Sequence, residues 1–336
     1  MKAHVTIKDL ARELDISPST VSRALKDHPD ISPETKMRVK ELAEQLNYKP
    51  NLVAQGLRNS KTNTIGVIVP EFIHFFFSTI ISGIENVAYA KGYNVILCQS
   101  AENYEREVTD TRALWNSRVD GMLVSLSRHT TKFDHFQELL DEELPIVFFD
   151  RVTNQLKTSQ VTVDDYMGAY KAVELLIKKG CKNIVHLAGP DTLDISKNRL
   201  KGYTDALESN GIKVKREMIK SCPKGTYEES KVITLEILEK HPEVDGIFGC
   251  NDMAALGGIL ALQEKNIPIP EQVRVVGFSD WQLSNLIKPR LTTVSQAGFE
   301  MGQEAANILI SEIESDDDPV LVKKVINTKL IERETT

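Results

Sequence analysis

One nine-residue stretch near the start of the chain combines short hydroxyl side chains with a single arginine. It runs from Ser17 to Leu25 and reads SPSTVSRAL. Ser17 before Pro18 is a helix start signal, because serine caps free N–H groups and proline fits the first helical position. Val21 and Leu25 then share an apolar face, and the hydroxyls and Arg23 lie elsewhere. Short hydroxyls allow close approach and arginine pairs with guanine, so the stretch predicts a helix that enters a DNA groove.

A second group of polar side chains follows apolar stretches that have the composition of β-strands. Asp150 comes directly after one such stretch, and Asn251 and Asp252 come after another. Ligands of α/β domains bind at the carboxyl ends of strands, and a paired amide and carboxylate can hold neighbouring hydroxyl groups. Asp252 also suits a structural role as a helix N-cap. The three phenylalanines at residues 75–77 suit either stacking on a sugar face or core packing.

The common motifs of hydrolases and nucleotide-dependent enzymes are absent from the sequence, so no enzyme activity is expected. The four cysteines are widely scattered and show no metal-ligand spacing, which predicts buried thiols and neither a metal nor a cofactor. Hydrophobic residues make up 41% of the chain, without a secretory leader or a membrane-spanning apolar run. We therefore expect a cytoplasmic protein of two or three domains that does not contact a membrane.

Charge is distributed unevenly along the 336 residues. The whole chain carries a formal net charge of −7, which by itself disfavours nucleic acid as a partner. Residues 1–62, however, hold 11 lysines and arginines against 8 acidic residues, a net charge of +3, and the remainder carries −10. A small basic head on an acidic body is compatible with DNA binding by the head.

Three short helices are expected before residue 49. Thr6 and Asp9 are spaced as in a capping box that begins the first helix, and Ser17 begins the second. A tight turn near Asp15 separates them, which is the arrangement of a helix-turn-helix. Ser32 begins the third helix. Residues 1–49 are thus predicted to form an all-α helix-turn-helix domain.

From residue 64 onward, short apolar strands alternate with amphipathic helices, the pattern of a parallel α/β sheet. Two successive series of this kind predict two similar lobes. The expected strands are residues 65–69, 94–97, 121–124, 146–149, 183–187, 246–248, 274–277, 291–294 and about 320–331. The expected helices are residues 78–90, 105–116, 168–178, 200–209, 228–240, 253–264 and about 301–313.

Three segments of the head, residues 6–11, 21–25 and 47–57, resemble the amino-terminal signature of the lactose-repressor (LacI/GalR) family. The resemblance implies that the second helix reads bases through Pro18, Ser19 and Arg23. It implies contacts to phosphate or sugar from Thr6, Ser17, Thr20, Ser22 and Asn51. The family often has tyrosine or methionine where this chain has Pro18, and the proline loses a polar contact.

The same resemblance makes residues 50–62 a hinge helix and linker. Ala54 shares the apolar face of this segment with Leu57. In the family the corresponding leucine enters the minor groove, where an apolar wedge between base steps kinks the duplex. A linker helix with a small hydrophobic seam is the plain alternative for these residues.

The body resembles the type I periplasmic-binding-protein core of the same family from end to end. The resemblance rests on residues 66–70, 119–121, 163–165, 199–203, 251–254, 276–278, 291–294 and 331–333. It implies three chain crossings between lobes, which we place near residues 162, 290 and 320. The expected amino-terminal lobe is then residues 63–162 and 291–319, and the carboxy-terminal lobe is residues 163–290 and 320–336.

The resemblance also implies an effector, a sugar or sugar derivative, bound between the two lobes. The residues expected to contact it are Phe76, Asp150, Arg199, Asn251, Asp280 and Gln296. Arg199 lies three residues before Gly202, the spacing of the family's effector-clamping arginine, and Gln296 also suits a tie between lobes. Where the family usually has aspartate after Gly277-Phe278, this chain has Ser279, so either Asp280 substitutes for it or the ligand differs.

Together these features predict a sequence-specific transcriptional regulator, most simply a repressor, that binds operator DNA under control of a small molecule. A two-fold symmetric operator calls for a homodimer. The chain has no apolar heptad tail after its last strand, unlike the family's tetrameric members, which also predicts a dimer. The competing interpretations are a sugar-binding transport protein and an enzyme on a two-lobe body. The head and the missing export signal argue against a transport protein, and the absence of the common catalytic motifs argues against an enzyme.

Overall fold

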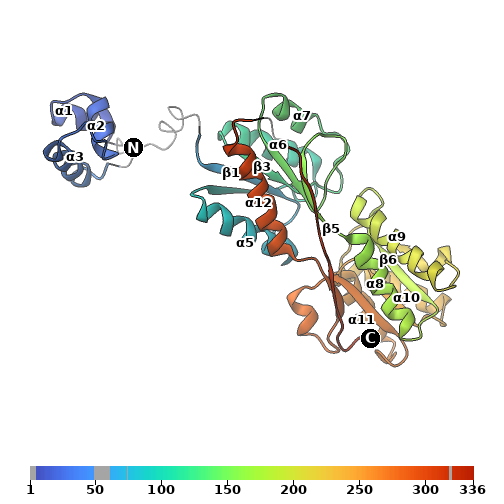
Figure 1. Cartoon of the computed structure of the whole chain (residues 1–336). Helices are drawn as coiled ribbons and strands as arrows, with labels where there is room; N and C mark the ends of the chain where they lie inside the picture. Colours follow the sequence, from blue (N-terminus) through green and yellow to red (C-terminus); the bar gives the residue numbers. More distant parts are fainter. Residues whose placement is uncertain (1–4, 49–60, 74, 318–319) are drawn as a thin grey trace. The chain divides into compact units, whose positions relative to one another are not determined.

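The computed structural model describes residues 5–48, 61–73, 75–317 and 320–336 of the chain (Figure 1). Two compact units are present, a head of residues 1–62 and a core of residues 63–336. The predicted hinge contacts Asn51, Ala54 and Leu57 fall outside the described residues. None of the helices in the described part is long and apolar enough to span a bilayer.

The head is the three-helix unit that the sequence predicts. Its helices are α1 (Ile7–Glu13), α2 (Pro18–Leu25) and α3 (Pro33–Gln45). Leu10, Val21 and Val39, one from each helix, are fully buried at the centre of a small apolar core. Four residues join α1 to α2, so the two helices form a helix-turn-helix.

The first lobe of the core is built on a six-stranded sheet in the order β11-β5-β4-β3-β1-β2, in which all paired strands are parallel. The central strands are buried along almost their whole length, as expected for a parallel sheet covered on both faces. The strands are β1 (Thr64–Val69), β2 (Asn94–Gln99), β3 (Gly121–Val124), β4 (Ile146–Phe149), β5 (Ser159–Val163) and β11 (Lys323–Ile326).

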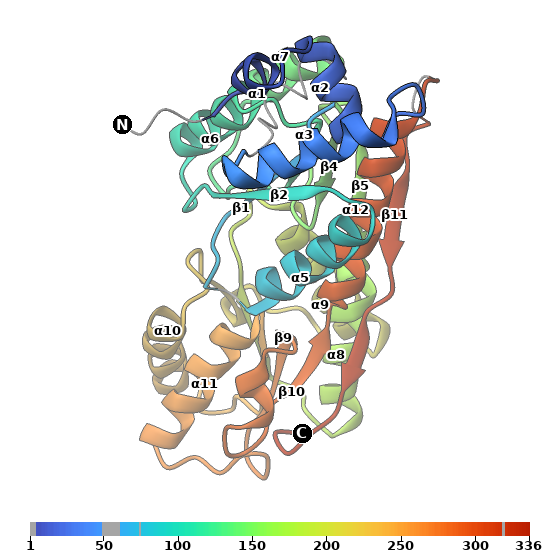
Figure 2. The ribbon, with the colours of Figure 1, turned by 90° about the vertical axis from the view of Figure 1, so that its left-hand side faces the viewer.

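Two pairs of helices cover this sheet. One apolar core contains side chains of α5 (Phe75–Ala90) and α12 (Gly298–Glu314), and a second contains side chains of α6 (Tyr104–Asn116) and α7 (Asp134–Asp141). Figures 1 and 2 show α5 and α12 side by side. Gly302 lets these two helices approach closely, because a Cβ atom at that position would lie 2.1 Å from the carbonyl oxygen of Ile80.

The second lobe repeats the plan with the order β12-β10-β9-β8-β6-β7. All its paired strands are parallel except β12, which runs antiparallel to β10. Its strands are β6 (Ile184–Ala188), β7 (Ile219–Ser221), β8 (Gly246–Gly249), β9 (Arg274–Ser279), β10 (Thr292–Ser295) and β12 (Lys329–Ile331). Its main helices are α8 (Asp165–Lys178), α9 (Asp194–Ser209), α10 (Tyr227–Lys240) and α11 (Asp252–Glu264). The predicted fold class, a helical head with a two-lobe parallel α/β core, is confirmed.

Two of the three crossings between lobes differ in place from the prediction. The first follows β5, as expected, but the second follows β10, which pairs with β9 in the second sheet. Residues 291–295 therefore belong to the second lobe and not to the first. The single strand expected at about 320–331 is two strands, since β11 pairs with β5 of the first sheet and β12 with β10 of the second. Figure 2 shows this carboxy-terminal segment running from one lobe to the other.

Candidate functional site: an interlobe cavity and an exposed helix face

A cavity of about 350 Å³ lies between the two lobes of the core, at the carboxyl ends of the strands. Both lobes contribute to its wall. The lining residues are Ile73, Phe75, Phe76, Phe77, Asp150, Arg151, Ile195, Arg199, Asn251, Asp252, Met253, Ser279, Trp281 and Gln296. Five of the six residues expected to contact an effector are among them, and the exception is Asp280.

The first lobe contributes an apolar wall and a carboxylate. The aromatic rings come from the first turn of α5, and the carboxylate is that of Asp150, directly after β4. Asp150 is only 4% exposed and adopts a left-handed backbone conformation with φ of 57°. No hydrogen bond from a described residue reaches its carboxylate, and the nearest cationic nitrogen, Nε of Arg151, is 3.9 Å away. Burial raises the pKa of Asp150 to about 6, although the charge of Arg151 opposes the shift.

Arg199, on α9 in the second lobe, is held in place by contacts within its own lobe. Its Nε atom donates to Oδ1 of Asp165 at 2.7 Å, and its Nη1 atom donates to the carbonyl oxygen of Cys250. The guanidinium carbon also lies 3.8 Å from the centroid of the Phe278 ring. Because Asp165 is buried and paired with it, Arg199 brings hydrogen-bond donors to the cavity without an uncompensated positive charge.

Asn251 and Asp252 do not form the free amide–carboxylate pair that the sequence suggested. Asn251 is the N-cap of α11, and its Oδ1 atom accepts from the backbone N–H of Ala254 at 2.7 Å. The Asp252 carboxylate accepts bonds from the backbone N–H of Trp281 and from the hydroxyls of Ser284 and Thr293. Asp252 is thus a structural group inside the second lobe, although it also lines the cavity.

Asp280 lies beside the cavity and not in its wall. Its carboxylate accepts a 2.7 Å hydrogen bond from Nη2 of Arg333, and Ser279 occupies the wall in its place. The backbone turns at this point, with φ of 128° at Ser279 and 55° at Asp280, which directs the two side chains differently. The expectation that Asp280 contacts an effector is therefore not supported, and Ser279 is the candidate.

Gln296 follows β10 at the second crossing and is 2% exposed. Its side chain forms no hydrogen bond within the described part of the chain, so nothing there supports the alternative of a tie between lobes. The sequence pointed to no effector contact for Ile73, Arg151, Ile195 or Met253, and it left Trp281 open between a stacking platform and a subunit contact. Two signals could have found some of them: Arg151 directly follows Asp150, and Ile195 lies one helical turn before Arg199.

In the head, α2 begins as the sequence predicts. The Ser17 hydroxyl accepts from the backbone N–H of Thr20 at 3.1 Å and also contacts the hydroxyls of Ser19 and Thr20. Arg23 is exposed on the side of the helix away from the buried Val21, and it has no partner among the described residues. Thr6 completes a capping box with Asp9 at the start of α1. The exposed face of α2 thus presents hydroxyl groups and one guanidinium group, that of Arg23, which forms no hydrogen bond or ion pair with a described residue.

Known proteins resemble both units. Residues 6–51 match the family model of bacterial regulatory proteins of the lacI family. Residues 62–333 match the model of periplasmic binding proteins and the sugar-binding domain of the LacI family. Catabolite control protein A of Priestia megaterium is 34% identical over 309 residues, covering 91% of this chain and 92% of that protein.

Two further relatives extend over nearly the whole chain. The HTH-type transcriptional repressor PurR of Vibrio atlanticus is 33% identical over 334 residues, covering 98% of both proteins. The structure of the transcriptional regulator CelR in complex with cellobiose covers 99% of this chain and 100% of its own, at 27% identity and a TM-score of 0.76. These relatives are DNA-binding regulators and not enzymes. A helix-turn-helix head joined to a two-lobe core, with matches along nearly its full length, places this chain in the LacI family of DNA-binding transcriptional regulators.

Proposed function

We propose that the chain is a repressor whose affinity for operator DNA is controlled by an uncharged, hydroxyl-rich ligand, a sugar or sugar derivative, held in the interlobe cavity. The observation that carries the proposal is the Asp150 carboxylate, which is buried at the cavity wall with no hydrogen bond from a described residue. Buried polar groups are normally hydrogen-bonded. A ligand hydroxyl is a donor that would satisfy this acceptor.

The charges around the cavity favour an uncharged ligand over an anionic one. Arg199 is paired with Asp165, and Arg151 is paired with Glu102. The Asp150 carboxylate accepts no hydrogen bond from a described residue, although Nε of Arg151 lies 3.9 Å away, and its negative charge at the wall would repel a phosphate or carboxylate group. The aromatic wall from α5 suits the apolar face of a sugar ring, and the similarity to a cellobiose-bound regulator agrees with this class of ligand.

In the head, we assign base reading to Ser19 and Arg23, with Pro18 adding only apolar contact. Thr6, Ser17, Thr20 and Ser22 are assigned to the phosphate backbone. Asn51, Ala54 and Leu57 remain proposed hinge contacts. Regulators of this kind act where the DNA is, so the proposal includes a cytoplasmic location.

A homodimer is part of the proposal, because a two-fold symmetric protein matches two operator half-sites. An exposed apolar surface on the first lobe is available for self-association. The edge strand β2 leaves Ile96 and Leu97 37% and 41% exposed, and Tyr89 on α5 is 84% exposed. Sedimentation velocity of the full chain is expected to give a dimer, and a stable tetramer would contradict this part of the proposal.

A thermal-shift panel tests the ligand class. Neutral sugars, including cellobiose, are compared with their phosphorylated and carboxylated counterparts and with nucleobases. A ligand at 100 times its Kd adds about 2.7 kcal/mol to the free energy of unfolding. We expect stabilisation by a neutral sugar, and its loss in Asp150→Asn but not in Asp205→Asn, a surface control on α9. Stabilisation by anionic ligands alone, or an Asp150→Asn variant that still responds fully, would overturn the proposal.

A further inference from the structure

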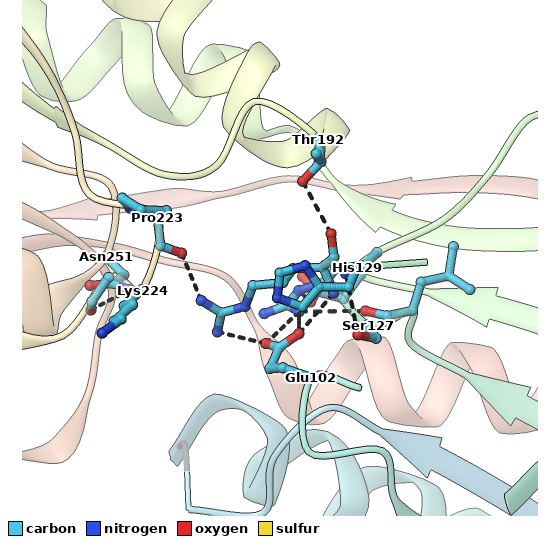
Figure 3. Close-up of polar contacts among 12 residues, drawn as sticks. Glu102, Ser127, His129, Thr192, Pro223, Lys224 and Asn251 are labelled. Atoms are coloured by element: carbon cyan, nitrogen blue, oxygen red, sulfur yellow. Dashed lines mark hydrogen bonds and ion pairs between the residues drawn. The ribbon is translucent and has the colours of Figure 1, made fainter. Parts of the chain in front are cut away.

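Arg128, in the loop after β3 of the first lobe, makes two hydrogen bonds to the second lobe. Its Nη1 atom donates to the carbonyl oxygen of Pro223 at 2.6 Å, and its own carbonyl oxygen accepts from the Thr192 hydroxyl at 3.2 Å. Figure 3 shows Pro223 and Thr192 of the second lobe near Glu102 of the first, with dashed lines that mark these hydrogen bonds. Residues from opposite lobes are thus joined through one side chain and one backbone group.

Glu102, in the turn between β2 and α6, holds Arg128 in position for these bonds. Its Oε1 atom accepts from Nη2 of Arg128 and its Oε2 atom from the backbone N–H of Arg128, each at 2.8 Å. The same carboxylate accepts from Nη1 of Arg151 at 2.8 and 2.9 Å. One carboxylate therefore fixes two arginines, of which Arg151 lines the interlobe cavity.

The electrostatics keep this cluster charged. Burial by itself would raise the pKa of Glu102, but the charge of Arg151 and the hydrogen bonds from both arginines lower it to about 2. The Glu102 side chain is 9% exposed, and those of Arg128 and Arg151 are 16% and 13% exposed. Removal of Glu102 would leave two partly buried arginines without the carboxylate that they share, so the arrangement of the cluster depends on Glu102.

The backbone on both sides of the cluster is constrained. Ala101 and Glu102 both adopt left-handed conformations, with φ of 51° and 54°, which direct the carboxylate inward. In the second lobe, the turn that presents the Pro223 carbonyl is held by Glu229, whose carboxylate accepts from the N–H groups of Lys224 and Gly225. The carbonyl oxygen of Gly225 accepts from Nδ2 of Asn251 at 3.2 Å, and Asn251 lines the cavity.

These contacts form a continuous path between the two walls of the cavity. The path runs from Asn251 through the turn at residues 223–225, across to Arg128, and through Glu102 to Arg151. A ligand that touches Asn251 and Arg151 would order both ends of the path at once. It would therefore favour the arrangement of lobes in which the Arg128 bonds are made.

We propose that Glu102, Arg128 and Arg151 form an interlobe latch, in which Glu102 is the positioning residue that couples occupancy of the cavity to the closed arrangement of the lobes. The role as a relay of ligand binding rests on the proposed function. The latch itself does not, because it is built from protein groups alone. Breaking it should open the lobes without unfolding either one.

The test measures the distance between the lobes in the full chain, without operator or ligand. Spin labels are placed at Glu138 on α7 and Glu208 on α9, exposed positions in the first and second lobe. A Cys98→Ser background removes the cysteine that is not fully buried, and dilution with unlabelled chain isolates distances within one molecule. Arg128→Met and Glu102→Gln should raise the ratio of open to closed molecules about tenfold or more, the effect expected from loss of a charge-assisted hydrogen bond.

Arg333→Met is the matched control. Arg333 is 14% exposed and, like Arg128, donates to one carboxylate and one backbone carbonyl, those of Asp280 and Leu291, but all three residues lie in the second lobe. It should leave the distance distribution unchanged. Thr192→Val removes only the second cross-lobe bond, and it should give a smaller shift in the same direction even if the charge variants fold poorly.

An unchanged distance distribution in folded Arg128→Met or Glu102→Gln would overturn the proposal, as would an equal shift in Arg333→Met. Addition of cellobiose then tests the coupling separately. If cellobiose binds to the wild type, it should shift the labels toward the short distance, and Glu102→Gln should weaken its binding about tenfold. Failure of sugars to bind at all would contradict the proposed function. It would not affect the conclusion about the latch, which rests on distances measured without ligand.

Discussion

The charged form of the Asp150 carboxylate costs stability in the folded core, and the proposed ligand would offset that cost. Its pKa is raised to about 6 in the folded core, from 3.8 when it is free in water, so the folded chain disfavours the charged form. Its contribution to stability is therefore complete below about pH 4 and is lost as the pH rises through about 6. At neutral pH the charged carboxylate therefore costs stability, and a hydrogen bond from the proposed ligand would offset this cost.

Asp150→Asn should consequently stabilise the ligand-free core at neutral pH. A shift from 3.8 to about 6 corresponds to about 3 kcal/mol, and relaxation around the site reduces this to about 1–3 kcal/mol. Urea unfolding between pH 3.5 and 8 measures the difference in the free energy of unfolding. Tryptophan fluorescence reports on the unit of residues 63–336, because Trp115 and Trp281 both belong to it. The free energies of unfolding of the wild type and of Asp150→Asn should become equal below about pH 4. A variant that is less stable than the wild type at pH 7.5 would contradict the raised pKa of Asp150.

Arg23 is the residue in the head with the most specific expected role. Its guanidinium has no partner among the described residues, and arginine bidentate to guanine is the commonest specific base contact. Arg23→Ala should weaken operator binding by about 1–3 kcal/mol and relax the preference at one base pair. Titrations against an operator set with single-base changes measure both effects. Arg12→Ala, an exposed arginine on α1 paired with Asp9, is the control. Equal losses on every sequence would reassign Arg23 to the phosphate backbone.

At the scale of elements, close helix contacts hold the first lobe together. The Cβ atom of an alanine at residue 302 would lie 2.1 Å from the carbonyl oxygen of Ile80, well inside the normal contact distance. Gly302→Ala should therefore destabilise the core by about 1–3 kcal/mol, although alanine gains about 1 kcal/mol in helix propensity. Gly258→Ala on α11 is the matched control, because its Cβ would meet Ile247 at an ordinary 3.4 Å, and it should be neutral or stabilising. Equal stability of the two variants would contradict the packing account.

Much of the element order could be predicted because its signals are local. The caps at Ser17 and Ser32 begin helices as expected, and the central strands of both sheets are unbroken apolar runs. Two strands escaped prediction. β5 (SQVTV) mixes polar with apolar residues although it lies inside the sheet between β4 and β11, and β7 is only three residues long. The division of residues 320–331 into β11 and β12 is set by which sheet has a free edge, and no local pattern contains that information.

The side chains of the cavity also could be predicted only where the sequence signal was local. Strand ends placed Asp150 and Asn251 correctly in its wall, because parallel strands bring their carboxyl ends together, whereas Gln296 was named from the family resemblance. The bonding state of each group could not be predicted. The Asp252 carboxylate accepts hydrogen bonds from Ser284 and Thr293, which lie more than thirty residues away in sequence. The Asp280 carboxylate accepts a hydrogen bond from Arg333.

For the molecule as a whole, we propose that a ligand in the interlobe cavity changes the affinity of the chain for operator DNA. The latch of Glu102, Arg128 and Arg151 is one route by which the lobes can respond to the ligand. Coupling between two sites of this kind is typically worth 1–3 kcal/mol, a change of about 5- to 150-fold in affinity. It is reciprocal, so operator DNA must change the affinity for the ligand by the same factor.

The most direct measurement is a fluorescence-anisotropy titration of an operator duplex, selected from random DNA by the full chain, with and without the sugar that stabilises the core. We expect the sugar to change the operator affinity of the wild type by at least about 5-fold. We expect no change in Asp150→Asn at the same sugar concentration, while that variant binds the operator normally without sugar. Identical operator affinity with and without a sugar that demonstrably occupies the cavity would contradict the account.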